Sequence, residues 1–430
     1  MTTTDELVVA LDAARDRFLA ILEPFDEPVL RRQHDVLMSP LLWDLAHVAN
    51  YEDLWLVRAL GGEPTRTGLD DLYDAFKQPR SAREALPLLD LASARAYGDA
   101  VRAQALDLLD GADLTDEGPV RLTRNGFVHR MVAQHEHQHA ETLLAAIQLL
   151  PPDEGHVLTS RPAPLAKVTP PAEVLVPGGP FLMGSADPGS LDNERPVHEV
   201  EVAPFWMDAA PVTNGQHRRF VEDGGYDDPQ WWGDLGWRWR QEAGLVAPQF
   251  WSRDGEGWTR LRFGNVEPLP DDEPVQHVSW HEADAYARWA GRRLPTEAEW
   301  EKAAVFDPDT GESRRWPWGD APVTSERANV GQRHLGPAPV GAYPDGVSAV
   351  GCHQMVGDVW EWTASDFRAY PGFEWYPYAE YSAVFYGPEH KVLRGSSWAT
   401  DPSVGRSTFR NWDFPIRRQI FAGFRTARDS

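Results

Sequence analysis

The segment from Phe127 to Leu150 contains neither Pro nor Gly, and its apolar residues recur at helical spacing. Pro151 and Pro152 follow it, which predicts where the helix ends. Within the segment, His135 and His139 are four residues apart, so on a helix both imidazoles lie on one face, one turn from each other. Two histidines at this spacing are suited to bind one metal ion. The segment therefore predicts a long helix that carries part of a metal site.

The same pattern is compatible with other roles. Histidine is often a surface or hydrogen-bonded residue without any metal. His137 is rotated by about 200° from His135, at roughly 100° per residue, so we expect it to face away from a metal held by the other two. The spacing also fits the zinc-protease signature, in which Glu136 would act as general base. A metal site of unspecified kind, a zinc-protease site and a purely structural role remain open at this point.

A metal site needs a third protein ligand whichever ion it holds, and the best candidate for this ligand lies far upstream. Residues 39–47 read Ser-Pro-Leu-Leu-Trp-Asp-Leu-Ala-His. We expect Ser39 to cap a helix that has Pro40 in its first turn and His47 in its interior. A ligand from this helix would join the pair from the later one.

Composition limits the kinds of partner. The chain has 430 residues, 41 basic and 66 acidic, for a formal net charge of -25. Such a charge argues against binding to nucleic acid or anionic lipid and favours a small-molecule substrate. No apolar run of about 18 residues is present to cross a membrane, and the first residues lack a secretion signal, so we expect a cytoplasmic protein. The single cysteine, Cys352, excludes an internal disulfide, and we expect it to be a small semi-buried residue.

The pattern along the chain predicts two domains of different kinds. Residues 1–152 are expected to form a four-helix bundle, residues 153–171 a Pro-rich linker, and residues 172–430 a domain rich in Gly, Pro and Trp. The fold class is therefore α+β. The expected bundle helices are Asp5–Leu22, Pro40–Leu60, Ser81–Leu109 and Phe127–Leu150.

Short strands and two helices are expected in the second domain. The runs that begin at Glu173 and Glu199 alternate in the manner of strands. A helix is expected at 281–290, and Thr296 with Glu299 forms a capping box that begins another.

Several stretches resemble known families. Ser39-Pro-x-x-Trp-Asp-x-x-His47 and His135-Glu-x-x-His139 are similar to the DinB-like four-helix bundle. The second half resembles the formylglycine-generating-enzyme fold, a C-type-lectin-like domain. The matching stretches are Phe181–Ser185, Asn193–Pro196, Pro211–Asn214, Arg293–Trp300, Gly357–Trp362 and Leu393–Trp398. Together the halves resemble the ergothioneine-pathway sulfoxide synthases, non-haem iron enzymes that join hercynine to a cysteine-containing thiol. Copper-dependent formylglycine-generating enzymes use a pair of cysteines. This chain has only one cysteine, so we do not expect that activity.

The resemblance implies a set of iron and hercynine ligands. It implies Fe(II) on His47, His135 and His139, and neutral imidazoles suit this ion. It places Gln138 at the hercynine substrate, and Asn411 and Trp412 near its trimethylammonium group. A quaternary ammonium is bound by aromatic faces, at about 0.5 to 2 kcal/mol per ring.

The resemblance also implies how the second substrate is bound. Asp413 and Arg417 would bind the ammonium and carboxylate of the glutamyl group in γ-glutamylcysteine. Arg80 and Arg83 would form a second clamp for an anionic group of the substrate. Without the resemblance, both arginines are expected to be solvated residues at the start of a helix. Cysteine itself is the alternative thiol donor. Oxygen is the oxidant that the family uses.

The segment 370–382 contains four tyrosines. The family pattern of two tyrosines three residues apart fits Tyr378 and Tyr381. We expect Tyr378 to be the catalytic proton donor and Tyr381 to contact substrate. Tyr376 is the alternative to Tyr378 if the register of this loop differs.

Overall fold

The computed structural model describes residues 2–151, 158, 161–255 and 257–430. The chain divides into two compact units, Met1–Val157 and Leu158–Ser430. Of the predicted linker, residues 153–157 and 159–160 lie outside the described residues, as does Pro152. The described stretch 161–171 has no regular secondary structure, and the amides of Lys167 and Val168 donate to the carbonyl of Gly341 within the second unit.

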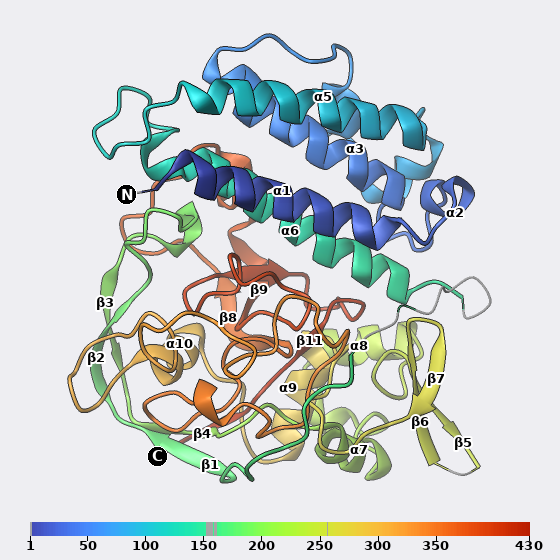
Figure 1. Cartoon of the computed structure of the whole chain (residues 1–430). Helices are drawn as coiled ribbons and strands as arrows, with labels where there is room; N and C mark the ends of the chain where they lie inside the picture. The colour runs from blue at the N-terminus through green and yellow to red at the C-terminus, as the bar shows by residue number, and fades with distance from the viewer. Residues whose placement is uncertain (1, 152–157, 159–160, 256) are drawn as a thin grey trace. The chain divides into compact units, whose positions relative to one another are not determined.

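Four long helices form the first unit, and Figure 1 shows them side by side. Helix α1 packs against α6, and α3 packs against both α5 and α6. The long helices are α1 (Thr4–Leu22), α3 (Leu41–Glu52), α5 (Leu91–Asp110) and α6 (Phe127–Gln148). The shorter elements are α2 (Glu27–Arg31), η1 (Asp53–Val57), η2 (Arg58–Leu60), α4 (Asp70–Tyr73), η3 (Arg80–Ala85) and η4 (Arg124–Gly126).

Helix α1 shows how local sequence and packing agree in this unit. Thr3 and Glu6 form a reciprocal capping box that satisfies backbone amides at the helix start. Leu7, Leu11 and Phe18 recur on one face and are almost completely buried. This spacing produces the apolar stripe that a bundle helix needs.

The predicted cap of α3 is wrong. The helix begins at Leu41 with Pro40 at the cap position and no side-chain cap bond. Ser39 Oγ instead accepts a hydrogen bond from Nη1 of Arg83 at 2.6 Å. A charged guanidinium is a stronger donor than a backbone amide, which explains why the hydroxyl is directed away from the helix end. The predicted helix then continues through π-helix η1 and 3-10 helix η2 to Gly61, whose φ of 95° ends it.

The predicted helix at 81–109 is two elements instead of one. Residues Arg80–Ala85 form the short 3-10 helix η3, and α5 begins only at Leu91. Pro87 lacks an amide hydrogen and disfavours helical geometry at the residue before it, so it interrupts the helical pattern. Asp90 then restarts the helix by accepting a hydrogen bond from the amide of Ser93 at 2.7 Å.

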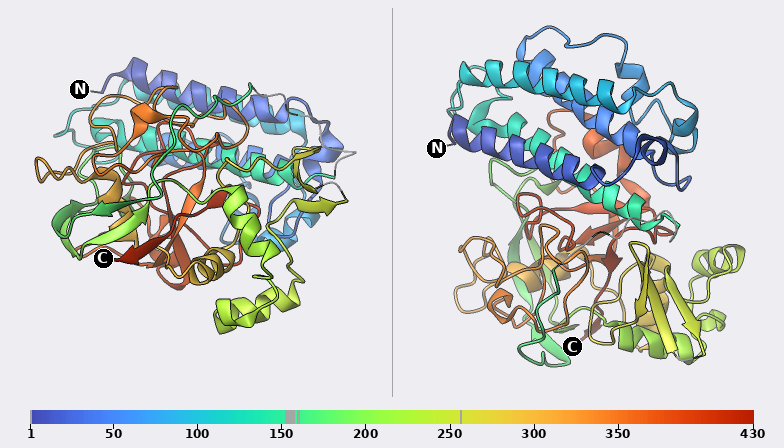
Figure 2. Two further views of the ribbon diagram at one scale, coloured as in Figure 1. Left: turned by 90° about the horizontal axis from the view of Figure 1, so that it is seen from below. Right: turned by 45° about the vertical axis from the view of Figure 1, so that its right-hand side comes forward.

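The described residues of the second unit form four small sheets. Strands β1 (Glu173–Val176), β4 (Phe205–Asp208) and β12 (Ala427–Asp429) form one, in the order β1-β4-β12. Strands β10 (Asn411–Asp413), β9 (Gly387–Arg394), β8 (Trp360–Phe367) and β11 (Ala422–Gly423) form the largest, in that order. The others pair β2 (Gly179–Met183) with β3 (His198–Val202), and β5 (Trp251–Asp254) with β6 (Gly257–Arg262) and β7 (Asn265–Pro268). In the right-hand view of Figure 2, the yellow β5-β6-β7 sheet lies apart from the β8-β9 region.

Helices and irregular segments complete this unit. The predicted strands at Glu173 and Glu199 are present as β1 and β3. The predicted capping box of Thr296 and Glu299 is present at the start of α10. The helices are α7 (Asn214–Glu222), α8 (Asp234–Glu242), α9 (Trp280–Trp289) and α10 (Glu297–Val305). The 3-10 turns are η5 (Asp192–Glu194), η6 (Pro229–Trp231), η7 (Pro344–Gly346), η8 (Ala379–Tyr381) and η9 (Ala383–Phe385).

Buried ion pairs hold the irregular segments of this unit together. Arg394 and Arg410 both donate to Glu297, at 2.8 Å and 2.6 Å, and all three side chains are buried. Arg425 donates to Glu361 at 2.7 Å in the same way. Removing one partner of such a pair leaves an uncompensated buried charge, which destabilises strongly. The Arg410 pair directly precedes β10, so it fixes the strand that carries Asn411 and Trp412.

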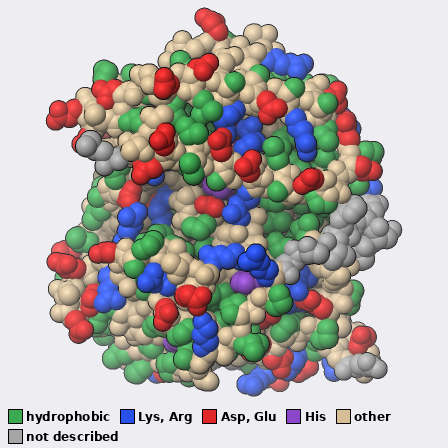
Figure 3. All heavy atoms as spheres, in the orientation of Figure 1, with side chains coloured by type: hydrophobic (Ala, Val, Ile, Leu, Met, Phe, Trp, Pro, Cys, Tyr) green, Lys and Arg blue, Asp and Glu red, His purple; other side chains and the backbone are tan. Residues whose placement is uncertain are grey.

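The surface is mixed in charge. On the face of the helical unit drawn in Figure 3, acidic side chains are interspersed with basic and hydrophobic ones. Within the described part of the chain, no helix has both the length and the apolarity needed to span a membrane.

Candidate metal centre and substrate site

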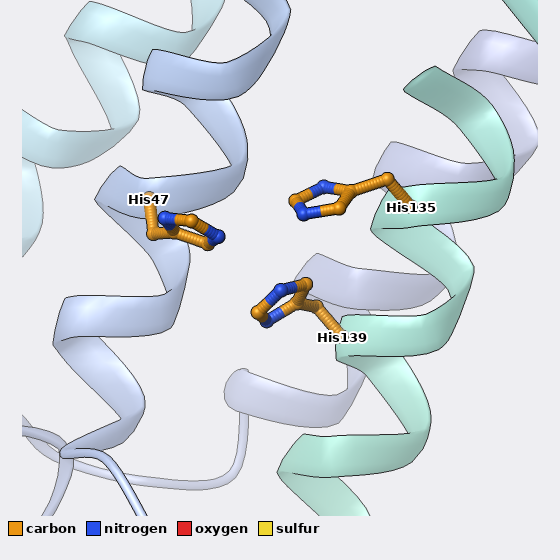
Figure 4. A group of neighbouring side chains, drawn as sticks. All are labelled: His47, His135 and His139. Carbon is orange, nitrogen blue, oxygen red and sulfur yellow. The ribbon is translucent and has the colours of Figure 1, made fainter. Parts of the chain in front are cut away.

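The structure brings His47, His135 and His139 together. His47 projects from α3 and the other two from consecutive turns of α6, and all three rings point toward one another (Figure 4). One potential ligand atom from each ring lies within 4.8 Å of the others. The ring centroids are 4.5 Å to 5.2 Å apart. Three nitrogen donors at these separations can converge on a single metal ion.

Hydrogen bonds orient two of the rings. Nδ1 of His47 is 2.7 Å from the carbonyl oxygen of Tyr73, and Nδ1 of His139 is 3.0 Å from Oδ1 of Asp44. When Nδ1 donates in this way, Nε2 carries the lone pair that a metal needs. The buried Nδ1 of His135 has no hydrogen-bond partner among the described residues.

Aromatic rings stack against two of the histidines. Trp43 stacks on His47 with 4.6 Å between centroids, and Tyr51 stacks on His135 at 3.7 Å. The guanidinium of Arg83 lies 3.6 Å from the centre of the Trp43 ring. These stacks restrict ring rotation, so the donors are largely arranged before any ligand binds.

Burial sets the charge state of the cluster. Loss of hydration lowers the pKa of His47 and of His135 well below the usual value, and the neighbouring His139 lowers both further. His47 and His135 are therefore neutral and keep the lone pairs with which imidazole binds metal. This donor set fits Fe(II) as it fits zinc, and three protein ligands leave coordination positions for other molecules.

Glu136 does not face this cluster as a free base. Its Oε1 accepts a hydrogen bond from Nε of Arg15 at 2.5 Å, and its Oε2 lies 3.6 Å from Nη2 of Arg102. Burial raises the pKa of Glu136, and the charge of Arg15 opposes that effect. A carboxylate engaged by two arginines in the bundle is a structural group, which argues against the zinc-protease interpretation. His137 is buried elsewhere on α6 and is not part of the cluster.

Other predicted residues of the first unit lie in different environments. Gln138 is half-buried and follows His135 by three residues, so it shares that face of α6. Arg80 is exposed, as expected for a solvated helix start. Arg83 is buried, so that expectation is wrong for it, and its Nε donates to the carbonyl of Gln78 at 2.9 Å. Burial lowers the pKa of Arg83 to about 10.

In the second unit, the predicted aromatic residues form one cluster. Trp412 stacks on Phe367 with 4.3 Å between centroids, and Tyr381 lies edge-on to Trp412 at 5.9 Å. The ring centroids of Tyr378 and Tyr381 are 6.2 Å apart. The loop between β8 and β9 supplies the two tyrosines, and β10 supplies the tryptophan.

Polar groups border this cluster. Nε of Arg417 lies 3.2 Å from Oδ2 of Asp413, so the two predicted glutamyl-binding residues form an ion pair. Oδ1 of Asn411 accepts from the amide of Trp412 at 2.9 Å, and its side chain is half-buried. Within the second unit, the structure thus brings Tyr378, Tyr381, Asn411 and Trp412 together, and it pairs Asp413 with Arg417.

Two groups that orient the histidines, the carboxylate of Asp44 and the carbonyl of Tyr73, were not predicted from the sequence. Asp44 precedes His47 by three residues, and this spacing on a helix is the signal that could have revealed it. The carbonyl of Tyr73 has no such signal. Cys352 is fully buried, whereas a semi-buried residue was expected, and burial raises the pKa of its thiol to about 11, which disfavours a nucleophilic role.

Comparison with protein families assigns each half of the chain. Residues 10–143 match the DinB superfamily, and residues 159–430 match the sulfatase-modifying factor enzyme 1-like domain. The protein thus combines a DinB-like helical bundle with a C-type-lectin-like domain, and the predicted α+β class is confirmed.

Full-length relatives narrow the class further. The chain is 51% identical to the hercynine oxygenase of Mycolicibacterium smegmatis, covering 100% of this chain and 99% of the relative. It is also 51% identical to the hercynine oxygenase of Mycobacterium tuberculosis, with 100% of both chains covered. The formylglycine-generating enzyme of Thermomonospora curvata is 34% identical over 60% of this chain and 93% of its own. The chain belongs to the hercynine oxygenase family.

Proposed function

We propose that this protein is an Fe(II)-dependent sulfoxide synthase that uses O2 to join γ-glutamylcysteine to hercynine in ergothioneine biosynthesis. The observation that carries the proposal is the convergence of His47, His135 and His139 in a chain that aligns end to end with hercynine oxygenases. Three imidazole ligands that leave coordination positions open are suited to an iron centre that binds a thiol and oxygen.

The overall reaction balances without a reducing cofactor. Forming the bond between the thiol sulfur and an imidazole carbon removes two electrons, and oxidising that sulfur to a sulfoxide removes two more. The four electrons reduce one O2, whose atoms enter the sulfoxide and one water molecule. The two hydrogens of that water balance those lost from the thiol and the imidazole ring.

The bound iron would supply a positive charge that favours the thiolate and a centre for activating oxygen. Trp412 offers an aromatic face to the trimethylammonium group of hercynine, with Asn411 beside it and Gln138 at the same substrate. Asp413 and Arg417 already pair at 3.2 Å, so they present opposite charges that match the ammonium and carboxylate of one glutamyl group. In this proposal Arg80 and Arg83 form the second clamp, which binds an anionic group of the substrate.

Tyr378 is the proposed proton donor. A phenol can donate a proton during oxygen reduction and thereby favour formation of the carbon-sulfur bond over simple oxidation of the thiol to a sulfinic acid. Tyr381 lies next to it and borders Trp412, which supports a contact with substrate. Tyr376 is the alternative donor on the same loop.

A product assay tests the proposal. Apo protein is reconstituted with Fe(II) under nitrogen and mixed with hercynine, O2 and equal concentrations of γ-glutamylcysteine and cysteine. We expect oxygen uptake and the γ-glutamyl sulfoxide by mass spectrometry. Predominance of the cysteine adduct would assign cysteine as the thiol donor. Zinc occupancy with no oxygen uptake would contradict the proposal.

A further inference from the structure

Asp192 lies beneath the loop that carries the proposed catalytic tyrosine. It is 3% exposed and begins the η5 turn, about 190 residues before that loop in the sequence. Its Oδ1 accepts a hydrogen bond from Oγ of Ser382 at 2.8 Å, and its Oδ2 accepts one from the amide of Tyr376 at 3.4 Å. One carboxylate therefore binds both ends of the segment 376–382.

The turn that carries Asp192 is itself anchored. Glu194 is fully buried and accepts hydrogen bonds from Nε of Arg406 at 2.8 Å and from Oγ1 of Thr408 at 2.7 Å. Nη1 of Arg410 donates to the carbonyl of Asn193 at 2.9 Å. These contacts join the turn to residues 406–410, which lead directly into β10. Asp192 is thus fixed relative to the strand that carries Trp412.

Between the two attachment points, Tyr381 faces that strand and Tyr378 lies next to Tyr381. The ring of Tyr381 is 5.9 Å from Trp412 and 6.2 Å from Tyr378. The buried hydroxyl of Tyr381 has no hydrogen-bond partner among the described residues, so no bond to its hydroxyl holds it in place. The position of the Tyr381 ring therefore depends on how the backbone is held at the ends of the segment.

We propose that Asp192 is a positioning residue, which holds the segment 376–382 so that Tyr381 is set against Trp412 and Tyr378 beside Tyr381. The inference rests on the proposed function, since it concerns the placement of the proton donor. Ser382 is its principal partner, because its hydroxyl is fully buried and bonds directly to the carboxylate. Burial raises the pKa of Asp192 to about 6, so near neutral pH the carboxylate still accepts both hydrogen bonds.

Product partition tests the proposal with a readout that loss of stability alone does not change. In D192A, misplacement of the donor should lower the ratio of sulfoxide to sulfinate by about tenfold. The KM for hercynine should change by less than about twofold, because Trp412 keeps its stack on Phe367. D192N retains one acceptor oxygen for Ser382 and should give an intermediate ratio. S382A removes only the hydrogen bond from Ser382 to Asp192, and it replaces D192A in this assay if D192A does not fold.

Asp208 provides a matched control. This carboxylate of β4 likewise accepts hydrogen bonds from a backbone amide and a hydroxyl, both of Thr426, at 2.7 Å and 2.6 Å. D208A should therefore lose comparable stability and keep the wild-type product ratio. An equal change of ratio in D208A and D192A would overturn the proposal, as would a wild-type ratio in both D192A and S382A.

Hydrogen exchange separates this inference from the proposed function. D192A should increase amide exchange selectively in residues 376–382, whatever reaction the protein catalyses. Unchanged exchange in that segment would overturn the inference. Wild-type protein that forms no sulfoxide would instead contradict the proposed function and leave the exchange result to stand on its own.

Discussion

Oδ1 of Asp44 lies 3.0 Å from Nδ1 of His139, and the two residues come from different helices of the bundle. Asp44 is 1% exposed, and its other oxygen is buried without a hydrogen-bond partner among the described residues. A carboxylate in this position fixes the tautomer of a metal-binding imidazole and increases its basicity.

Replacing Asp44 should therefore weaken metal binding without removing a ligand. We expect D44N to lower the affinity for Fe(II) by about 10- to 100-fold, because His139 loses its orienting acceptor. Anaerobic calorimetric titration of the apo protein with Fe(II) measures the change. D53N is the control, because Asp53 is a buried carboxylate that binds Thr65 and Arg58 instead of a histidine. Equal affinity in D44N and wild type would contradict the assigned role.

Removing a histidine of the cluster should have a larger effect. We expect H47A, H135A and H139A each to reduce Fe(II) affinity on the order of 100-fold or more, because each leaves two protein ligands of three. Metal content after dialysis, measured by mass spectrometry, gives the result. H137Q changes a buried histidine of the same helix outside the cluster and should keep its iron. Full iron occupancy in any of the three alanine variants would exclude that residue as a ligand.

Exchange of Tyr378 for Phe should change the product more than the binding. Y378F keeps the ring and loses the phenolic proton, so the sulfinate fraction should rise, and turnover to sulfoxide should fall by about 10²- to 10⁴-fold. Quantitative mass spectrometry of both products measures the partition. Y376F tests the alternative register of the loop. A wild-type partition in Y378F together with a shifted one in Y376F would transfer the role to Tyr376.

Glu136 should matter for stability and not as a general base. E136A leaves the buried guanidinium of Arg15 without one of its two carboxylate partners, which should cost about 3 to 5 kcal/mol in the free energy of unfolding. Urea denaturation measures this loss. The double variant R15L/E136L removes both charges and should recover much of it. If E136Q abolished turnover while stability and iron content stayed normal, a catalytic role for this residue would be indicated.

Asp358 should give the second unit a distinctive pH dependence. Burial raises the pKa of its carboxyl from about 3.8 to about 6, although donors from Ala338, Asn329 and Gln354 oppose the shift. A carboxyl whose pKa is raised in the folded state contributes stability that is complete below about pH 4 and is lost as pH rises through 6. The difference in unfolding free energy between wild type and D358N should therefore fall by about 2 kcal/mol between pH 4 and pH 8. A constant difference across this range would contradict the assignment.

The sequence predicted the helical half well wherever local rules decide the structure. The start of α1 follows from its capping box, and the extents of α1 and α6 follow from apolar periodicity, and both signals act over a few residues. The predictions for Ser39 and for the helix at 81–109 are wrong because a tertiary donor, Arg83, and a local break at Pro87 overrode the pattern. Arg83 itself illustrates the limit, because its burial against Trp43 depends on segments distant in sequence.

The sequence by itself determined the pairing of His135 with His139, because helical geometry alone places residues four apart on one face. It also determined the two-domain order through the change in composition near residue 172. Only the tertiary structure decided that Asp44 orients His139, that Glu136 serves the bundle core, and that Asp192 holds the tyrosine loop. Each of these contacts joins residues that are about 95 to 190 positions apart, so they depend on how the chain packs and not on any local pattern.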